Sequence, residues 1–111
     1  MSFDLKVKRY TILKMSEETV EWRDIEHYEN YQVSNNGQVK NVKSGKILKL
    51  ERGTSKAGYF QVGLCNHGQR KRFHIQRLVA ESFLENPDGK LNVEHIDENV
   101  SNNNVSNLRW V

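Results

Sequence analysis

The sequence contains very little cysteine. Cys65 is the single cysteine among 111 residues, which excludes an intramolecular disulfide framework and a zinc cluster built from several thiolates. Because Cys65 lies in a segment with the pattern of a β-strand, we expect a small buried side chain rather than a reactive nucleophile.

Long hydrophobic runs are also absent. No apolar stretch approaches the ~20 residues that a membrane-spanning helix needs, and the N-terminus lacks the hydrophobic core of a signal peptide. The sequence therefore predicts a soluble, intracellular protein with no membrane partner.

Positive charge is in small excess and unevenly placed. Lys and Arg number 17 against 14 acidic residues, and the pI is near 9.1. Most of the bases lie between Lys40 and Arg77, whereas the acids gather in residues 17–29 and 81–98. A positive field over the middle of the chain suits an anionic partner, although many proteins without one are equally basic.

The length allows one compact body or two small modules packed against each other. Alternating apolar and polar residues from Phe3 to Val7 predict a strand in an N-terminal extension, residues 1–20, to which we assign no function. We expect the rest to divide into a β-rich module at residues 21–75 and a second unit at residues 76–111.

Turn signals place two β-hairpins in the first unit. Asn35-Asn36-Gly37 separates two short β-prone runs, because Asn-Gly accepts the positive φ angles of a tight turn. A second turn at residues 66–69 joins two further strands. One face of this second hairpin is expected to be apolar, and the other to carry bases and an aromatic ring: Tyr59, Gln61, Arg70, Arg72 and His74. Other aromatic residues are expected as core anchors: Trp22, Tyr28 and Tyr31.

The second unit begins with a helix. Apolar residues at helical spacing predict it over residues 76–84, and Asn86-Pro87-Asp88-Gly89 ends it. A short strand is expected from Leu91 to His95, followed by an Asn-rich loop over residues 96–104. The fold class is therefore α+β: a small antiparallel sheet, then a helix and a short hairpin.

The residues with most chemical potential are Glu94 and His95. A carboxylate binds a hard divalent cation, and a neutral imidazole takes a proton from water because its pKa lies near neutrality. Where a strand ends, the backbone bends so that both side chains reach one phosphate. An isolated Glu-His pair before an Asn-rich loop is, however, more often a solvated turn.

Several ordered blocks of residues 21–111 resemble the phage and intron-encoded HNH homing endonucleases. Glu21-Trp22-Arg23-Asp24-Ile25, Tyr31-Gln32-Val33-Ser34-Asn35 and Gly37-Gln38-Val39 resemble the nuclease-associated modular DNA-binding domain that precedes many of these enzymes. Four further blocks resemble the HNH motif and the helix before it: Arg77-Leu78-Val79-Ala80, His95-Ile96-Asp97, Asn102-Asn103 and Asn107-Leu108-Arg109-Trp110-Val111.

This resemblance implies a fold and a set of roles. The second unit would be a ββα-metal-like HNH hairpin that lacks its final helix and last metal ligand, because the chain stops at Val111. His95 would be the general base, Glu94 the metal-binding carboxylate, and Asn103 and Asn107 would organise the loop through backbone hydrogen bonds. The implied cofactor is Mg²⁺ or Mn²⁺, and the implied partner is double-stranded DNA.

Two positions depart from the family pattern. Gln76 stands where the family commonly has a histidine, and Glu98 replaces a loop glycine. If the Glu98 position requires a positive φ, the cost is ~1–2 kcal/mol.

The expected DNA contacts are Tyr59, Arg70, Lys71, Arg72, His74 and Arg77. The alternative for the strand residues is an ordinary solvated face. The alternative for Arg77 is an ion pair with Glu81 one turn along the helix.

The leading hypothesis is a monomeric HNH DNA endonuclease with one metal ion, acting in the cytoplasm of an infected cell or encoded by a mobile element. A second hypothesis is a DNA-binding module without catalysis, derived from a truncated nuclease. A third is a protein-interaction domain with no nucleic-acid role.

Overall fold

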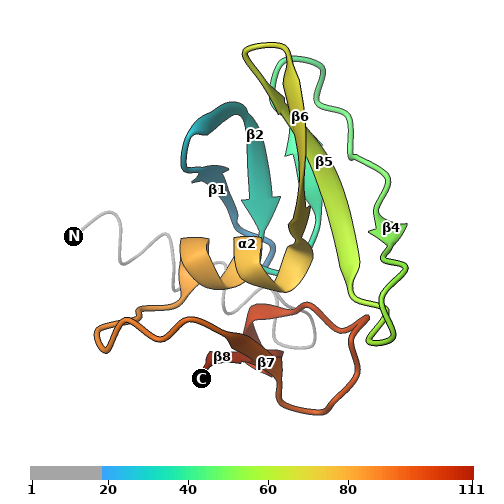
Figure 1. The fold of residues 1–111 in the computed structure, drawn as a ribbon. Coiled ribbons are helices and arrows are strands. Elements are labelled where there is room, and N and C mark those ends of the chain that lie inside the picture. Colours follow the sequence, from blue (N-terminus) through green and yellow to red (C-terminus); the bar gives the residue numbers. More distant parts are fainter. Residues whose placement is uncertain (1–18) are drawn as a thin grey trace, which may run out of the picture.

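The computed structural model describes residues 19–111, and the strand expected near Phe3 lies outside them. Three antiparallel sheets surround the helix α2 (Ile75–Phe83). In Figure 1 the helix crosses the middle of the fold, with the two β-hairpins of the first unit above it and the C-terminal hairpin below it. The predicted α+β class is confirmed.

The first sheet contains β1 (Trp22–Ile25), β2 (Tyr28–Ser34) and β3 (Val39–Asn41), in that order. The hairpin predicted at the Asn-Gly turn is confirmed, since β2 and β3 pair antiparallel and Gly37 has φ +89°. The sequence predicted the apolar anchors around β1 but not that β1 pairs with β2.

The second sheet contains β4 (Glu51–Arg52), β5 (Phe60–Asn66) and β6 (Gln69–His74). Its register confirms the predicted faces: Val62 pairs with Phe73 on the apolar face, while Gly63 pairs with Arg72 on the other. One prediction for β5 is wrong. Cys65 is exposed rather than buried, because it pairs with Arg70 on the solvent face.

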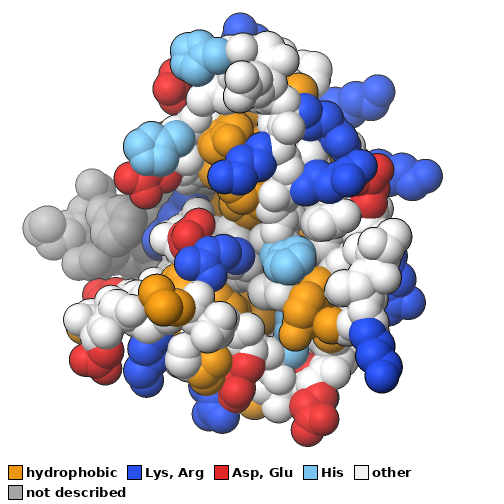
Figure 2. Space-filling view, in the orientation of Figure 1, with side chains coloured by type: hydrophobic (Ala, Val, Ile, Leu, Met, Phe, Trp, Pro, Cys, Tyr) orange, Lys and Arg blue, Asp and Glu red, His pale blue; other side chains and the backbone are white. Residues whose placement is uncertain are grey.

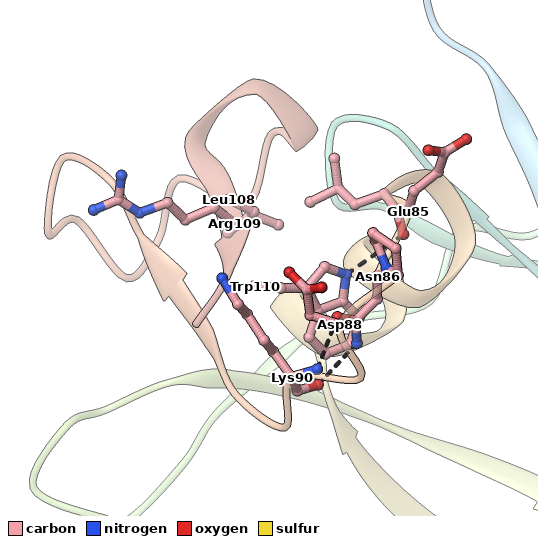
Figure 3. Close-up of a pocket in the computed structure, with 9 residues that line it drawn as sticks. Glu85, Asn86, Asp88, Lys90, Leu108, Arg109 and Trp110 are labelled. Carbon is pink, nitrogen blue, oxygen red and sulfur yellow. Dashed lines mark hydrogen bonds between the residues drawn. The ribbon is translucent and has the colours of Figure 1, made fainter.

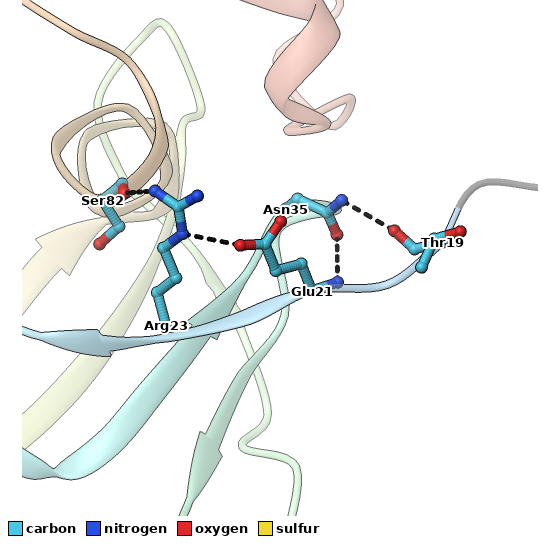
Figure 4. Close-up of polar contacts among 5 residues, drawn as sticks. All are labelled: Thr19, Glu21, Arg23, Asn35 and Ser82. Carbon is cyan, nitrogen blue, oxygen red and sulfur yellow. Dashed lines mark hydrogen bonds and ion pairs between the residues drawn. The ribbon is translucent and has the colours of Figure 1, made fainter. Parts of the chain in front are cut away.

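Helix α2 follows β6 without a loop, and its apolar residues pack on the first two sheets. The Arg23 guanidinium joins β1 to the end of the helix: it donates to the Ser82 carbonyl at 2.8 Å (Figure 4) and lies 4.6 Å from the Phe83 ring centre. No helix among residues 19–111 is long and apolar enough to cross a membrane.

The C-terminal hairpin contains β7 (Val93–His95) and β8 (Leu108–Trp110), with the 3₁₀ turn η1 (Val105–Asn107) before β8. These strands pair antiparallel, so that His95 lies opposite Leu108. The strand predicted near residues 91–95 is thus confirmed in a shorter form, and β8 is the second strand of the expected hairpin, whose residues the sequence did not specify.

A single apolar cluster connects both units. Val33 and Val39 from the first sheet, Val62 and Leu64 from the second, and Leu108 from β8 are members, together with Ile25, Tyr31, Ile75, Leu78 and Val79. Tyr31 is buried as predicted, whereas Trp22 and Tyr28 are half-buried. The C-terminal hairpin therefore shares its core with the β-rich module instead of forming one of its own.

Asn35 provides a second connection between the units. Its backbone carbonyl accepts a hydrogen bond from the Val105 N–H at 2.8 Å. Its side chain accepts from the Glu21 N–H at 3.0 Å and donates to the Thr19 carbonyl at 2.9 Å (Figure 4). The predicted turn thus contacts the Asn-rich loop directly, which its sequence did not indicate.

Candidate functional site

His95 lies at the end of β7 and is only 8% exposed. Its Nε2 is 2.7 Å from Oδ1 of Asn103, which is also buried. The Asn103 amide nitrogen donates to the Val100 carbonyl at 3.4 Å, so the amide oxygen faces the imidazole. Nε2 must therefore carry the hydrogen, and Nδ1 is the unprotonated nitrogen of the neutral ring.

The loop beyond His95 is held by a network around Asp97. Its carboxylate accepts hydrogen bonds from the Asn99 backbone at 2.8 Å and from the side chains of Asn102 at 3.0 Å and Asn107 at 2.8 Å. These bonds, with Asn102 contributing most, lower the pKa of Asp97 below its ordinary value of 3.8. The Asp97 side chain therefore acts in the folded protein as a charged acceptor that closes the loop.

Asn107 closes the same loop through the backbone. Its Oδ1 accepts from the Asp97 N–H at 3.0 Å, and its amide nitrogen donates to the Asn102 carbonyl at 2.9 Å. Glu98 adopts φ +64° in the turn after His95, a conformation that glycine adopts more easily. The loop thus retains its shape despite an unfavourable residue at this position.

Tyr59 lies against His95. The two ring centres are 5.8 Å apart and their planes differ by 19°, which is an offset stack. The His74 ring contacts Tyr59 edge-on at 5.3 Å. The structure therefore brings Tyr59, which the sequence grouped with the DNA contacts, to the predicted general base.

Glu94 forms an ion pair with its cross-strand partner. Its Oε2 is 2.5 Å from the Arg109 Nε. Neighbouring residues of a strand point to opposite sides, so Glu94 does not share the side of β7 that holds the His95 ring. A pocket lies between the end of α2 and β8 (Figure 3). Arg109 is among its lining residues, with its guanidinium extending away from the others, and neither Glu94 nor His95 lines it.

A divalent cation at this site would have few protein ligands. Residues 19–111 contain no group of three or more His, Cys, Asp and Glu side chains close enough to hold an ion. Glu94 offers one carboxylate, with an oxygen engaged by Arg109, on the side of β7 away from the His95 ring. Mg²⁺ commonly takes one or two carboxylates and completes its shell with water and substrate phosphates, so Glu94 alone would be a small protein contribution to such a site.

The outer face of β5 and β6 is basic. Arg70 and Arg72 are each about half exposed, and both lie near the same Glu51 carboxylate oxygen, at 3.6 and 3.7 Å. Figure 2 shows Lys and Arg side chains gathered over this hairpin, with an acidic side chain among them. Gly63 provides room for the Arg70 guanidinium, since a Cβ there would lie 2.3 Å from it.

Two of the expected DNA contacts lie away from this face. Lys71 pairs with Leu64 on the opposite face of the sheet, where its ammonium group lies 5.5 Å from the Phe73 ring centre. Arg77 forms the ion pair with Glu81 that the sequence left open, at 3.3 Å. Its Nη1 also donates to the Leu91 carbonyl at 2.8 Å, which joins α2 to the segment before β7. The six predicted contacts therefore do not form one surface.

Gln76, at the position where the family pattern has histidine, is 5% exposed. Its Oε1 is buried and accepts no hydrogen bond from the described part of the chain. Such an unpaired amide oxygen costs roughly 1–3 kcal/mol relative to a paired one.

Gly37 makes a contact that sequence analysis missed. It lies in the turn between β2 and β3, and a Cβ at this position would be 2.8 Å from the Asn103 Cβ and 3.2 Å from the Asn103 carbonyl oxygen. The Asn-Gly pair indicated a turn but gave no signal that the turn packs against a residue 66 positions later in the chain. The side chain that holds His95 is therefore supported by the β-rich module.

Comparison with known proteins finds relatives over most of the chain. Residues 21–65 match the NUMOD4 motif. The chain is 48% identical over 93 residues to DNA endonuclease I-HmuI of Bacillus phage SP01, an alignment that covers 83% of this chain and 52% of that protein. It is also 42% identical over 89 residues to the uncharacterised HNH endonuclease L245 of Acanthamoeba polyphaga mimivirus, covering 80% of this chain and 26% of that protein.

The fold agrees with this likeness. The solved structure describing DNA binding and cleavage by the HNH homing endonuclease I-HmuI matches with a TM-score of 0.74 and 49% identity, over 82% of this chain and 52% of the other. The chain spans between about a quarter and a half of the length of the curated relatives it matches. The chain is a relative of the HNH homing endonucleases, and its residues 21–65 carry the NUMOD4 motif.

Proposed function

We propose that this chain takes part in hydrolysing phosphodiester bonds of double-stranded DNA, with His95 as the general base. The observation that carries the proposal is the buried imidazole whose Nε2–H is engaged by Asn103, which leaves Nδ1 as a proton acceptor. The similarity to I-HmuI, a homing endonuclease that binds and cleaves DNA, supports the same reaction.

In this reaction His95 Nδ1 takes the proton from a water molecule as the water oxygen attacks phosphorus. The P–O bond to the leaving oxygen breaks, and that oxygen takes a proton from solvent. The imidazolium that forms keeps its Nε2–H bond to Asn103, which stabilises the charge and prevents the ring from turning.

The proposed cofactor is Mg²⁺ or Mn²⁺, with Glu94 as its protein ligand. When bound, the ion would stabilise negative charge on the phosphate and on the leaving oxygen. Glu94→Gln should weaken Mn²⁺ binding measured by calorimetry in the presence of a DNA duplex, while Glu85→Gln, in the exposed segment after α2, should not. Equal Mn²⁺ affinity of both variants would remove Glu94 from the site.

The proposed DNA contacts lie on the outer face of β5 and β6. Arg70, Arg72 and His74 would orient the duplex through its phosphates, which position a protein without specifying sequence. We propose that the protein acts as a monomer in the cytoplasm of an infected cell, in keeping with its phage and viral relatives.

The test is nicking of supercoiled plasmid with Mg²⁺ or Mn²⁺. His95→Ala should lose nicking by at least ~100-fold, the usual contribution of a general base, and should bind DNA as the parent does. His67→Ala, in an exposed turn, is the matched control and should nick normally. If His95→Ala nicks at the parental rate, the assigned role is wrong.

A second candidate function is DNA binding without cleavage. It is favoured by the ion pair that occupies one Glu94 oxygen and by the small donor set among the described residues. This candidate predicts salt-dependent duplex binding, with nicking absent at every concentration of Mg²⁺ and Mn²⁺ tested. Metal-dependent nicking that disappears in His95→Ala would reject it.

A further inference from the structure

We propose that Tyr59 is a positioning residue for His95: its ring fixes the plane of the imidazole and thereby the direction of Nδ1. The inference rests on the proposed role of His95. Its basis is the nearly parallel contact between the two rings, whose centres are 5.8 Å apart with planes 19° from each other. Tyr59 comes from the β-rich module, just before β5, whereas His95 belongs to the HNH hairpin.

The stack supplies a restraint that the hydrogen bond lacks. The contact with Asn103 holds one point of the imidazole, Nε2, but leaves the ring able to rock about that point. A flat neighbour on the ring face opposes this rocking. The two contacts together define both the position and the plane of the ring, and the lone pair of Nδ1 lies in that plane. Proton transfer requires this direction to be kept within ~10–20°.

Tyr59 is itself held in place. Its backbone carbonyl accepts a hydrogen bond from the Gly53 N–H at 2.8 Å, which fixes the chain next to β4. The His74 ring contacts it edge-on at 5.3 Å. Tyr59 is half-buried in this arrangement, so the support is anchored to the second sheet rather than to a solvated side chain.

This placement changes the role expected for Tyr59 from sequence. A DNA-contact residue offers its ring or hydroxyl to the duplex, and its loss weakens binding. The ring face of Tyr59 that stacks on His95 cannot stack on anything else. Loss of the ring should therefore reduce the rate of the chemical step and leave duplex affinity unchanged.

The experiment compares Tyr59→Leu and Tyr59→Phe in the full chain. Tyr59→Leu should lower kcat for plasmid nicking by about 10–100-fold, the scale of a misplaced catalytic group, while the Kd for duplex DNA stays within about twofold. Tyr59→Phe keeps the ring and should restore kcat to within about threefold of the parent. Tyr28→Leu is the matched control, because Tyr28 is another half-buried aromatic residue with an edge-on ring contact, to Phe73 at 5.1 Å.

Either of two results would overturn the proposal. If Tyr59→Leu raises the Kd for DNA and leaves kcat intact, Tyr59 is a DNA contact. If Tyr28→Leu lowers kcat as much as Tyr59→Leu does, the effect is a general loss of folded structure.

A spectroscopic measurement separates this inference from the proposed function. The His95 ring protons lie in the ring-current field of Tyr59, so that their NMR signals should move in Tyr59→Leu and stay in place in Tyr59→Phe and Tyr28→Leu. If the parent protein does not nick DNA, the proposed function fails while these signals still report whether Tyr59 fixes the ring. Unshifted His95 signals in Tyr59→Leu would refute the stack itself.

Discussion

The two polar regions of this protein are built in opposite ways. On the outer face of β5 and β6, Arg70 and Arg72 are half exposed and share one oxygen of Glu51 at distances beyond 3.5 Å. In the C-terminal hairpin and its loop, His95 and Asn103 are buried, and the His95 Nε2 lies 2.7 Å from the Asn103 Oδ1. Loose ion pairs let long side chains adjust to a duplex, whereas a buried hydrogen bond fixes one geometry for chemistry.

The largest expected effect comes from removing the buried hydrogen bond between Asn103 and His95. Asn103→Ala removes the acceptor of the His95 Nε2–H bond, so that the imidazole loses its orientation. Plasmid nicking should fall about 100-fold, as for other groups misplaced at a reacting centre, while duplex affinity in a gel shift remains at the parental level. Asn86→Ala, which removes only hydrogen bonds to Lys90 in a distant loop, should retain full activity.

Crowding Asn103 from the turn between β2 and β3 should have the next largest effect. Gly37→Ala would place a Cβ 2.8 Å from the Asn103 Cβ at φ +89°. Gly45→Ala is the matched control: its φ is +74° and no atom lies within 4 Å. Both variants carry backbone strain, so the crowding at Asn103 should appear as an additional loss of ~1–3 kcal/mol in the free energy of unfolding by urea. Equal losses for the two variants would show that the contact is unimportant.

Removing the carboxylate that Arg70 and Arg72 share should produce a smaller effect of opposite sign, an increase in affinity for DNA. Glu51→Gln removes the anion shared by Arg70 and Arg72, which then face DNA phosphates without a competitor. We expect tighter duplex binding and a log–log salt dependence steeper by up to ~0.9 for each additional phosphate contact. Fluorescence anisotropy at several salt concentrations measures both quantities. Weaker binding by the variant would mean that Glu51 orders the arginines for DNA instead of competing with it.

The smallest effect concerns pH. The pKa of Asp97 is lowered in the folded protein from its ordinary value of 3.8, chiefly by the Asn102 side chain. Its contribution to stability is therefore complete above pH 3.8 and is lost as the pH falls through the lower pKa of the folded state. Urea unfolding at a series of pH values should show less acid dependence for Asp97→Asn than for Asp88→Asn. Identical acid dependence of the two variants would contradict this assignment.

The sequence predicted the elements that local chemistry specifies. The Asn-Gly turn, the alternation along β5 and β6, and the helical spacing in α2 each depend on neighbouring residues, and each is confirmed. The residues of β8, the second strand of the expected hairpin, were not located because three residues are too few for a detectable period and the partner β7 lies beyond a long loop. Pairing across such a distance leaves little local trace.

For the candidate site too, the sequence indicated individual residues but not the contacts that distant segments make with them. His95 and Asn103 were singled out through resemblance, but the contacts that orient them come from distant parts of the chain. Tyr59 was grouped with the expected DNA contacts because it alternates with the basic residues. Alternation indicates the sheet face on which a side chain lies, but not which residue of another segment packs against it. Lys71 follows the same rule of alternation, which places it on the face opposite Arg70 and Arg72.

The contact between the Gly37 turn and the Asn-rich loop limits how such proteins exchange parts during evolution. A recombination joint at the start of α2 would bring together a new sheet module and an old hairpin. The incoming module would need a residue without a side chain at the apex of that turn, and a carbonyl positioned for the Val105 N–H. Modules that lack these features could be appended to the hairpin but would leave its histidine unsupported.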